Sequence, residues 1–97
     1  MKISVRFFTT IREITNKREE TLQFPNNKNI TIDAVLQILS NQYGKDFVDY
    51  VYDPDTSKVK GFLQFLVNGK SASTQNGLQT ELKDGDVLAI LPPVGGG

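Results

Sequence analysis

The sequence contains no cysteine, no histidine and no tryptophan among its 97 residues. The absence of cysteine excludes disulfides and thiol nucleophiles. Together with the absence of histidine, it removes the usual zinc ligand sets and the commonest general base near neutral pH. The aspartate pairs Asp53 with Asp55 and Asp84 with Asp86 fit turn positions better than an acid–base site. The composition therefore argues against a self-contained enzyme with bound metal or cofactor.

The sequence also lacks an excess of one charge and any long hydrophobic run. Eleven basic residues balance eleven acidic ones, whereas proteins that bind nucleic acid usually carry a basic excess. No stretch approaches the length needed to span a bilayer, and the N-terminal "MKISVRFFTT" lacks the apolar core of a signal peptide. The sequence predicts a soluble cytoplasmic protein with no nucleic-acid partner and no membrane partner.

A chain of this length and a hydrophobic fraction of 38% predict one domain with one modest core. Apolar and polar residues alternate from Lys2 to Phe8, which is typical of a half-buried strand. Phe8 directly follows Phe7 on this strand. We therefore expect its ring to point away from the core side and treat it as a possible contact residue.

One long helix is expected at Ile32–Tyr43, where apolar residues recur at steps of three and four. Thr31 is a plausible N-cap and Gly44 suits a C-terminal αL position. The polar stretch at 9–20 predicts a loop with a short helical turn, and 45–52 a second helical turn. Further strands are expected at 20–24, 62–67, 70–73 and 87–91, with a hairpin turn at Asn68-Gly69.

This order of elements predicts an α+β fold, the ubiquitin-like β-grasp: a mixed sheet of four to five strands with one main helix packed on one face. The first and last strands are expected to lie side by side and parallel at its centre. A central strand that is paired on both sides and largely covered would explain why Val87–Leu91 is apolar at nearly every position. We expect residues 1–91 to form the β-grasp domain and 92–97 an extended, flexible C-terminal tail.

The tail "LPPVGGG" is unusual for a small domain. Pro92 and Pro93 lack amide donors, so they end the strand and favour an extended exit. The glycines from Gly95 to Gly97 have no side chains, and an extended run from Leu91 reaches roughly 20 Å. Such a tail can deliver a terminal carboxylate into another protein's active site. A frayed end without a role is the alternative.

The segment "LKDGDVLAILPPVGGG" resembles the C-terminus of the MoaD and ThiS family of sulfur carriers. This family comprises the small subunit of molybdopterin synthase, the thiamine sulfur carrier and the ubiquitin-related modifiers. The opening "ISVRFFTTIREIT" and the hairpin "FLVNGK" resemble the same family, so the similarity spans nearly the whole chain. The stretch 45–61 is longer than in the shortest members and resembles the longer modifiers and archaeal forms.

The resemblance implies chemistry done on this protein by other proteins. An E1-like enzyme uses ATP to adenylate the carboxylate of Gly97, and a sulfur donor (a sulfurtransferase or cysteine desulfurase) converts it to a thiocarboxylate. The molybdopterin synthase large subunit then receives the sulfur. Contacts with these partners are implied for the tail and for two apolar residues: Gly96, Gly95, Val94, Pro93, Pro92, Leu91 and Phe8.

Several alternatives remain at the level of sequence. Phe8 and Leu91 also fit ordinary sheet packing, and Arg12 and Glu13, which match the family's R-E, fit either rim contacts or a solvated surface. The main functional interpretation is the small subunit of molybdopterin synthase. A modifier attached to lysines, a carrier for tRNA thiolation and an inert β-grasp interaction domain are the alternatives.

Overall fold

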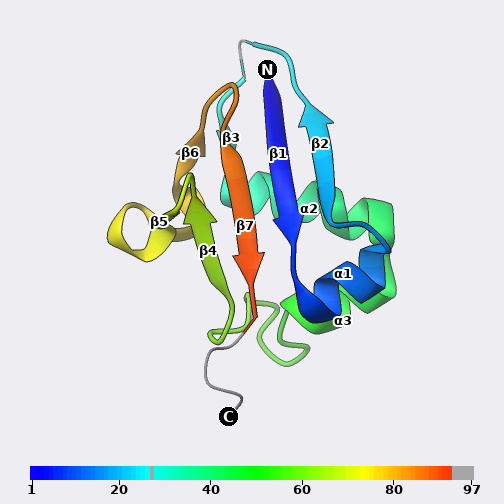
Figure 1. The fold of residues 1–97 in the computed structure, drawn as a ribbon. Coiled ribbons are helices and arrows are strands. Elements are labelled where there is room, and N and C mark those ends of the chain that lie inside the picture. Colours follow the sequence, from blue (N-terminus) through cyan, green and yellow to red (C-terminus); the bar gives the residue numbers. More distant parts are fainter. Residues whose placement is uncertain (27, 93–97) are drawn as a thin grey trace.

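The computed structural model describes residues 1–26 and 28–92 and contains a five-stranded mixed sheet (Figure 1). Along the sheet the strand order is β2-β1-β7-β4-β5. A two-stranded sheet, β3 with β6, lies beside it. The strands are β1 (Lys2–Phe7), β2 (Glu19–Gln23), β3 (Ile30–Thr31), β4 (Gln64–Val67), β5 (Lys70–Ser71), β6 (Glu81–Leu82) and β7 (Val87–Leu91).

The last strand occupies the centre of the sheet, as the sequence predicts. β7 pairs parallel with β1, with Phe7 opposite Ile90, and antiparallel with β4, with Gln64 opposite Leu91. The β1–β2 hairpin and the crossover helix complete the ubiquitin-like β-grasp fold. The prediction of the fold class is therefore confirmed.

The main helix, α2 (Ile32–Tyr43), has the predicted bounds. The Thr31 hydroxyl caps it by accepting a hydrogen bond from the Ala34 amide at 3.2 Å. Gly44 ends it with φ of 80° and ψ of −150°. This conformation is outside the expected αL region, although its positive φ still favours glycine.

Two shorter helices are longer than the single turns expected from the sequence. α1 (Thr9–Thr15) and α3 (Lys45–Val51) each contain seven residues. Ile11 is buried from α1, and Phe47 and Val51 are buried from α3. Their spacing of four places Phe47 and Val51 on one face, and burial of that face stabilises a segment too short to be helical alone. Two single-turn 3₁₀ helices, η1 (Ala72–Thr74) and η2 (Gly77–Gln79), follow β5.

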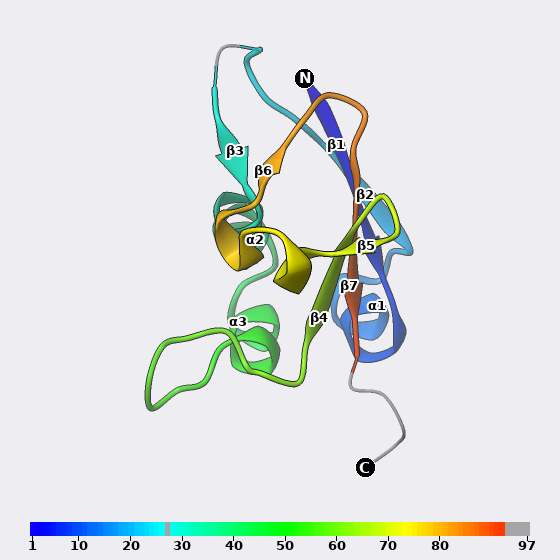
Figure 2. The same cartoon turned by 90° about the vertical axis from the view of Figure 1, so that its left-hand side faces the viewer.

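The core lies between one face of the large sheet and the helices α2 and α3 (Figure 2). Alternate residues of β7 are buried on this face, namely Leu88 and Ile90, each with no exposed surface. Val87, Ala89 and Leu91 lie on the other face and are only half-buried. β7 is therefore paired on both edges, as expected, but helices cover it on one face only.

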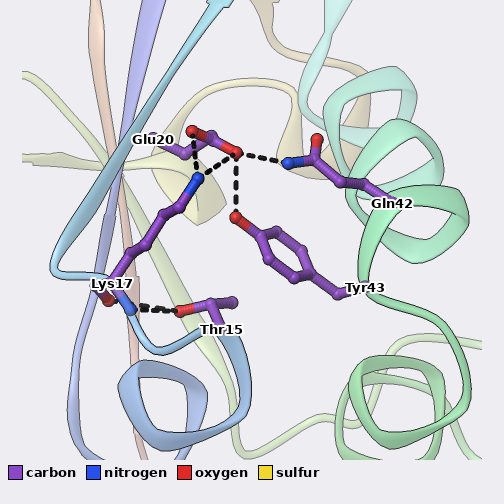
Figure 3. Close-up of polar contacts among 5 residues, drawn as sticks. All are labelled: Thr15, Lys17, Glu20, Gln42 and Tyr43. Carbon is purple, nitrogen blue, oxygen red and sulfur yellow. Dashed lines mark hydrogen bonds and ion pairs between the residues drawn. The ribbon is translucent and has the colours of Figure 1, made fainter.

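A cluster of polar side chains ties β2 to the end of α2 (Figure 3). The Glu20 carboxylate accepts hydrogen bonds from the Tyr43 hydroxyl at 2.8 Å and from the Gln42 amide, and it pairs with the Lys17 ammonium at 3.2 Å. The bond from Tyr43 is the main cause of the lowered pKa of Glu20, and Gln42 and Lys17 add to it. Burial, followed by the contact with Glu20, raises the pKa of Tyr43 to about 12.

No helix in the part of the chain that the structure describes is long and apolar enough to cross a membrane.

Candidate functional site at the root of the tail

The predicted site begins where the chain leaves the centre of the sheet. Leu91 is the last residue of β7 and Pro92 follows it directly; both are half-buried. Because β7 is hydrogen-bonded to β1 and β4 on its two edges, the position and direction of this exit are fixed by the fold. The predicted site residues Pro93, Val94, Gly95, Gly96 and Gly97 lie outside the described residues.

Phe8 and Leu91 lie at the end of the sheet where β1 and β7 finish. Phe8 directly follows β1 and keeps an extended backbone, with φ of −130° and ψ of 148°. The parallel pairing of β1 with β7 ends at Phe7 and Ile90, and Phe8 and Leu91 are the residues that directly follow this last pair. Phe7 is fully buried whereas Phe8 is half-buried, so the two rings point to different sides of the sheet.

The side chain of Arg12 lies over the ring of Phe8. Its guanidinium carbon lies 6.0 Å from the centre of the Phe8 ring, a distance at which a cation is attracted to an aromatic face. The side chain comes from α1, which starts immediately after Phe8. Glu13, the other residue of the R-E pair, is exposed on the same helix.

Sequence reasoning missed the rest of this apolar surface. Leu66 of β4 lies opposite Ala89 of β7, and both are half-buried on the face that carries no helix. The sequence contains a signal for this surface, namely the five consecutive apolar residues Val87–Leu91. In a strand with only one helix-covered face, such a run leaves an apolar strip on the other face. We call this strip the open-face strip; it consists of Leu66, Val87, Ala89 and Leu91.

Charged residues border the open-face strip on the side of β1. Arg6 is exposed, and it lies next to Ala89 in the parallel register and opposite Glu19 in the antiparallel one. A partner that covers the strip therefore meets an apolar centre with a charged rim, which is the usual anatomy of a protein interface.

The side chains around the tail root form a mainly apolar surface with charged neighbours. Phe8 and the open-face strip are apolar, and the arginines Arg6 and Arg12 lie beside them. Among residues 1–26 and 28–92, no three acidic side chains come close enough together to hold a metal ion. The described part of the site presents a main-chain exit beside an apolar surface.

A family model described as the ThiS family matches residues 5–97. The chain belongs to the ThiS family. It is 30% identical over 97 residues to small archaeal modifier protein 3 of Haloferax volcanii, and the match covers the whole of both chains. It is 32% identical over 68 residues to a putative sulfur carrier protein of Archaeoglobus fulgidus, covering 70% of this chain and 75% of that one. ThiS-family members of this kind are sulfur carriers and ubiquitin-like modifiers.

Solved structures show the same relationship. The small archaeal modifier protein 1 of Methanosarcina acetivorans is 28% identical, with a TM-score of 0.80 over 99% of this chain and 96% of that one. A putative molybdopterin converting factor, subunit 1, of Pyrococcus furiosus is 26% identical, with a TM-score of 0.74 over 97% and 99%. The BexX/CysO complex of Amycolatopsis orientalis contains a chain that is 25% identical, with a TM-score of 0.72 over 98% and 99%.

Proposed function

We propose that this protein is a sulfur carrier whose C-terminal Gly97 is activated as an adenylate and then converted to a thiocarboxylate. Membership of the ThiS family over residues 5–97, which includes the tail, is the observation that carries this proposal. An E1-like enzyme joins the Gly97 carboxylate to AMP and releases pyrophosphate from ATP. The persulfide of a sulfurtransferase or cysteine desulfurase then displaces AMP and forms an acyl disulfide. A second thiol of the donor system attacks this disulfide, which releases the Gly97 thiocarboxylate and leaves a disulfide on the donor side. Activation is required because a free carboxylate is a poor electrophile, whereas a mixed anhydride has a good leaving group.

The parts of the chain have different roles in this proposal. Phe8 and the open-face strip dock on the activating enzyme and later on the sulfur acceptor, because they form the apolar surface next to the exit of the tail. Pro92 and Pro93 keep the chain from continuing the sheet, so the tail enters the partner's active site. The protein itself is a co-substrate, and the partners supply ATP, sulfur and catalytic groups.

We further propose that the thiocarboxylate serves molybdopterin synthase, with this chain as the small subunit. Two observations support this assignment: the tail "PPVGGG" and the similarity over nearly the full length to the molybdopterin converting factor subunit of Pyrococcus furiosus. The large subunit of the synthase is then the partner that covers the open-face strip and receives the tail.

A second function is favoured by a separate observation. A relative that matches the chain from end to end is a small archaeal modifier protein. In a modifier, the same adenylate ends as an isopeptide bond between Gly97 and a lysine of a target protein. Donation of sulfur to transfer RNA is a further outcome of the same activation.

Mass spectrometry of the intact protein tests the carrier proposal. We expect that incubation with ATP, an E1-like enzyme and a sulfur donor exchanges one oxygen of Gly97 for sulfur. A chain without Gly96 and Gly97 is the matched control and should stay unmodified. An unchanged Gly97 in the complete reaction would contradict the carrier function.

The destination of the sulfur is tested with the thiocarboxylated protein. Formation of molybdopterin from its pterin precursor, after addition of the synthase large subunit, supports the small-subunit role. Covalent high-mass adducts with target lysines that need Gly96 and Gly97, without molybdopterin formation, would replace that role by the modifier function.

A further inference from the structure

Phe62 is the most exposed large hydrophobic residue in the part of the chain that the structure describes. Its exposed fraction is 44%, compared with 36% for Ile38 and 37% for Val48. It is not part of the open-face strip, because it lies in a turn before β4. The Leu63 amide closes this turn by donating to the Lys60 carbonyl at 3.2 Å. An apolar ring exposed on a turn raises the question of what covers it.

The ring of Phe62 is held in place by its neighbours. The Tyr50 ring of α3 packs against it edge to face, with centroids 6.2 Å apart and an interplanar angle of 60°. The Lys60 ammonium lies 5.8 Å from the centre of the ring and donates to the Asp49 carbonyl at 2.8 Å. The Lys60 amide also donates to the Val51 carbonyl at 2.8 Å. The turn is therefore fastened to α3 and presents the ring in a defined position, which lowers the entropy cost of binding.

This turn lies at the end of the molecule where the tail leaves the sheet. β4 begins at Gln64, two residues after Phe62, and Gln64 lies opposite Leu91 at the end of β7. Figures 1 and 2 both show the loop before β4 and the end of β7 at the same end of the fold. Phe62 thus lies near the tail root, but on the side of α3 rather than on the open face.

The short distance from Pro92 to Gly97 limits where the activating enzyme can be. Five residues follow Pro92 up to Gly97, and five extended residues reach at most roughly 18 Å. An enzyme that adenylates Gly97 in an enclosed ATP site must therefore bring its own surface close to this end of the domain. The groups beside the exit, including Phe62 on the side of α3, are then within reach of that enzyme surface.

We propose that Phe62 is an anchor residue for the E1-like activating enzyme, which takes its ring into an apolar pocket beside the tail entrance and faces Lys60 with an acidic group. This inference rests on the proposed function, because it needs Gly97 to be the activated residue. The acidic group follows from the position of Lys60: when the ring is buried, the ammonium beside it loses water and needs a partner of opposite charge.

The surface next to the turn suits such a contact. A groove of about 410 Å³ lies between the turn and the 3₁₀ helices, and its apolar lining includes Val59, Leu63, Ala72 and Leu78. Lys60 and Gly61, the residues just before Phe62, also line this groove, so an enzyme surface that covers Phe62 finds further apolar contacts beside the turn. A central aromatic anchor with apolar surroundings is the arrangement typical of binding hot spots.

The test is ATP–pyrophosphate exchange by the purified E1-like enzyme of the same organism, measured against the concentration of the full-length protein. We expect Phe62→Ala to raise KM for the protein about tenfold with kcat unchanged, because the lost contact acts in binding. Ile38→Ala is the matched control: Ile38 is a hydrophobic residue of similar exposure on α2, and its substitution should leave KM within about twofold.

Two further variants report on the proposed chemistry. Phe62→Leu should recover part of the affinity, because the pocket is apolar. Lys60→Glu should raise KM at low salt, and the increase should shrink at high salt as charge repulsion is screened. Thermal unfolding midpoints equal to that of the unsubstituted protein would show that the variants are folded.

The outcomes separate this inference from the proposed function. If the unsubstituted protein supports no exchange, the proposed function fails. If it supports exchange but Phe62→Ala and Ile38→Ala have the same KM, the anchor role of Phe62 is wrong. A loss of affinity for the synthase large subunit alone, with normal activation, would also overturn the assignment to the activating enzyme.

Discussion

Tyr43 links the folding of this domain to pH. Its hydroxyl donates to Glu20 across the gap between α2 and β2, and its pKa is raised to about 12 by burial and by that carboxylate. In the unfolded chain the phenol ionises near its ordinary value of 10. The stabilisation is therefore complete below pH 10 and is lost as the pH rises to about 12. Glu20 has the opposite dependence: its lowered pKa stabilises the fold above the ordinary carboxyl range and ceases to do so as the pH falls through the folded-state value.

We predict that Tyr43→Phe lowers the free energy of unfolding by about 1 kcal/mol at neutral pH, because it removes one hydrogen bond to a charged acceptor. It should also reduce the loss of stability between pH 10 and about 12. Part of the alkaline loss of stability should remain in the variant, since burial also raises the pKa of Tyr52. Urea unfolding at several pH values measures both effects, and an alkaline slope equal to that of the unsubstituted protein would contradict the prediction.

The residues that sequence reasoning identified are those whose neighbours are fixed by local pattern. Phe8 was identified because two aromatic residues follow each other in an alternating strand. The partners of Glu20 could not be identified, because Gln42 and Tyr43 are 22 and 23 residues away. Phe62 was read as part of a strand, because an apolar run does not show where a turn ends and pairing begins.

Individual elements were predicted well where capping or turn chemistry marks their ends. α2 follows its predicted bounds, and the hairpin between β4 and β5 turns at Asn68-Gly69, where φ is +51° and +86°. Two positive φ values in succession are those of the hairpin turn that this dipeptide favours. The Asn68 amide oxygen also accepts from the Val87 amide at 2.9 Å, so the turn is attached to the start of β7.

Two glycines offer a matched test of this turn. Gly69→Ala should lower the free energy of unfolding by about 1–2 kcal/mol, because a Cβ is disfavoured at φ of +86°. Gly61→Ala should be neutral or stabilise by up to about 1 kcal/mol, because φ there is not in the left-handed region and nothing lies within 4 Å of the added Cβ. Guanidinium unfolding compares the two variants, and equal effects would show that the turn conformation is not the cause.

For the molecule as a whole, the order of strands and helix was enough to predict the topology. Which faces of β7 are covered was harder to predict from the sequence. A strand that is apolar at every position can have both faces covered, or it can have one covered face and one face that serves as a docking surface. The buried core of the described residues extends from Ile3 to Ile90, and the division into a domain at 1–91 and a tail at 92–97 stays a prediction.

Removing the end of the tail should therefore affect function without affecting stability. Deletion of Gly96 and Gly97 should change the free energy of unfolding by less than about 0.5 kcal/mol, since glycine adds no side chain to a core and ordering it costs entropy. The same deletion should abolish adenylation. Parallel unfolding and pyrophosphate-exchange measurements test this pair of expectations, and a clearly destabilised truncated chain would refute the first.

The position of β7 between two partners has a mechanical consequence. A pulling force applied at Pro92 acts along β7, and the hydrogen bonds to β1 and β4 lie across that direction. These bonds must then break together by shear, whereas a force applied across an edge strand would open them one after another. The domain is thus most resistant to mechanical unfolding when the force acts along β7. A bound partner, or an unfolding motor that acts on a conjugate, would pull the C-terminal end in this direction.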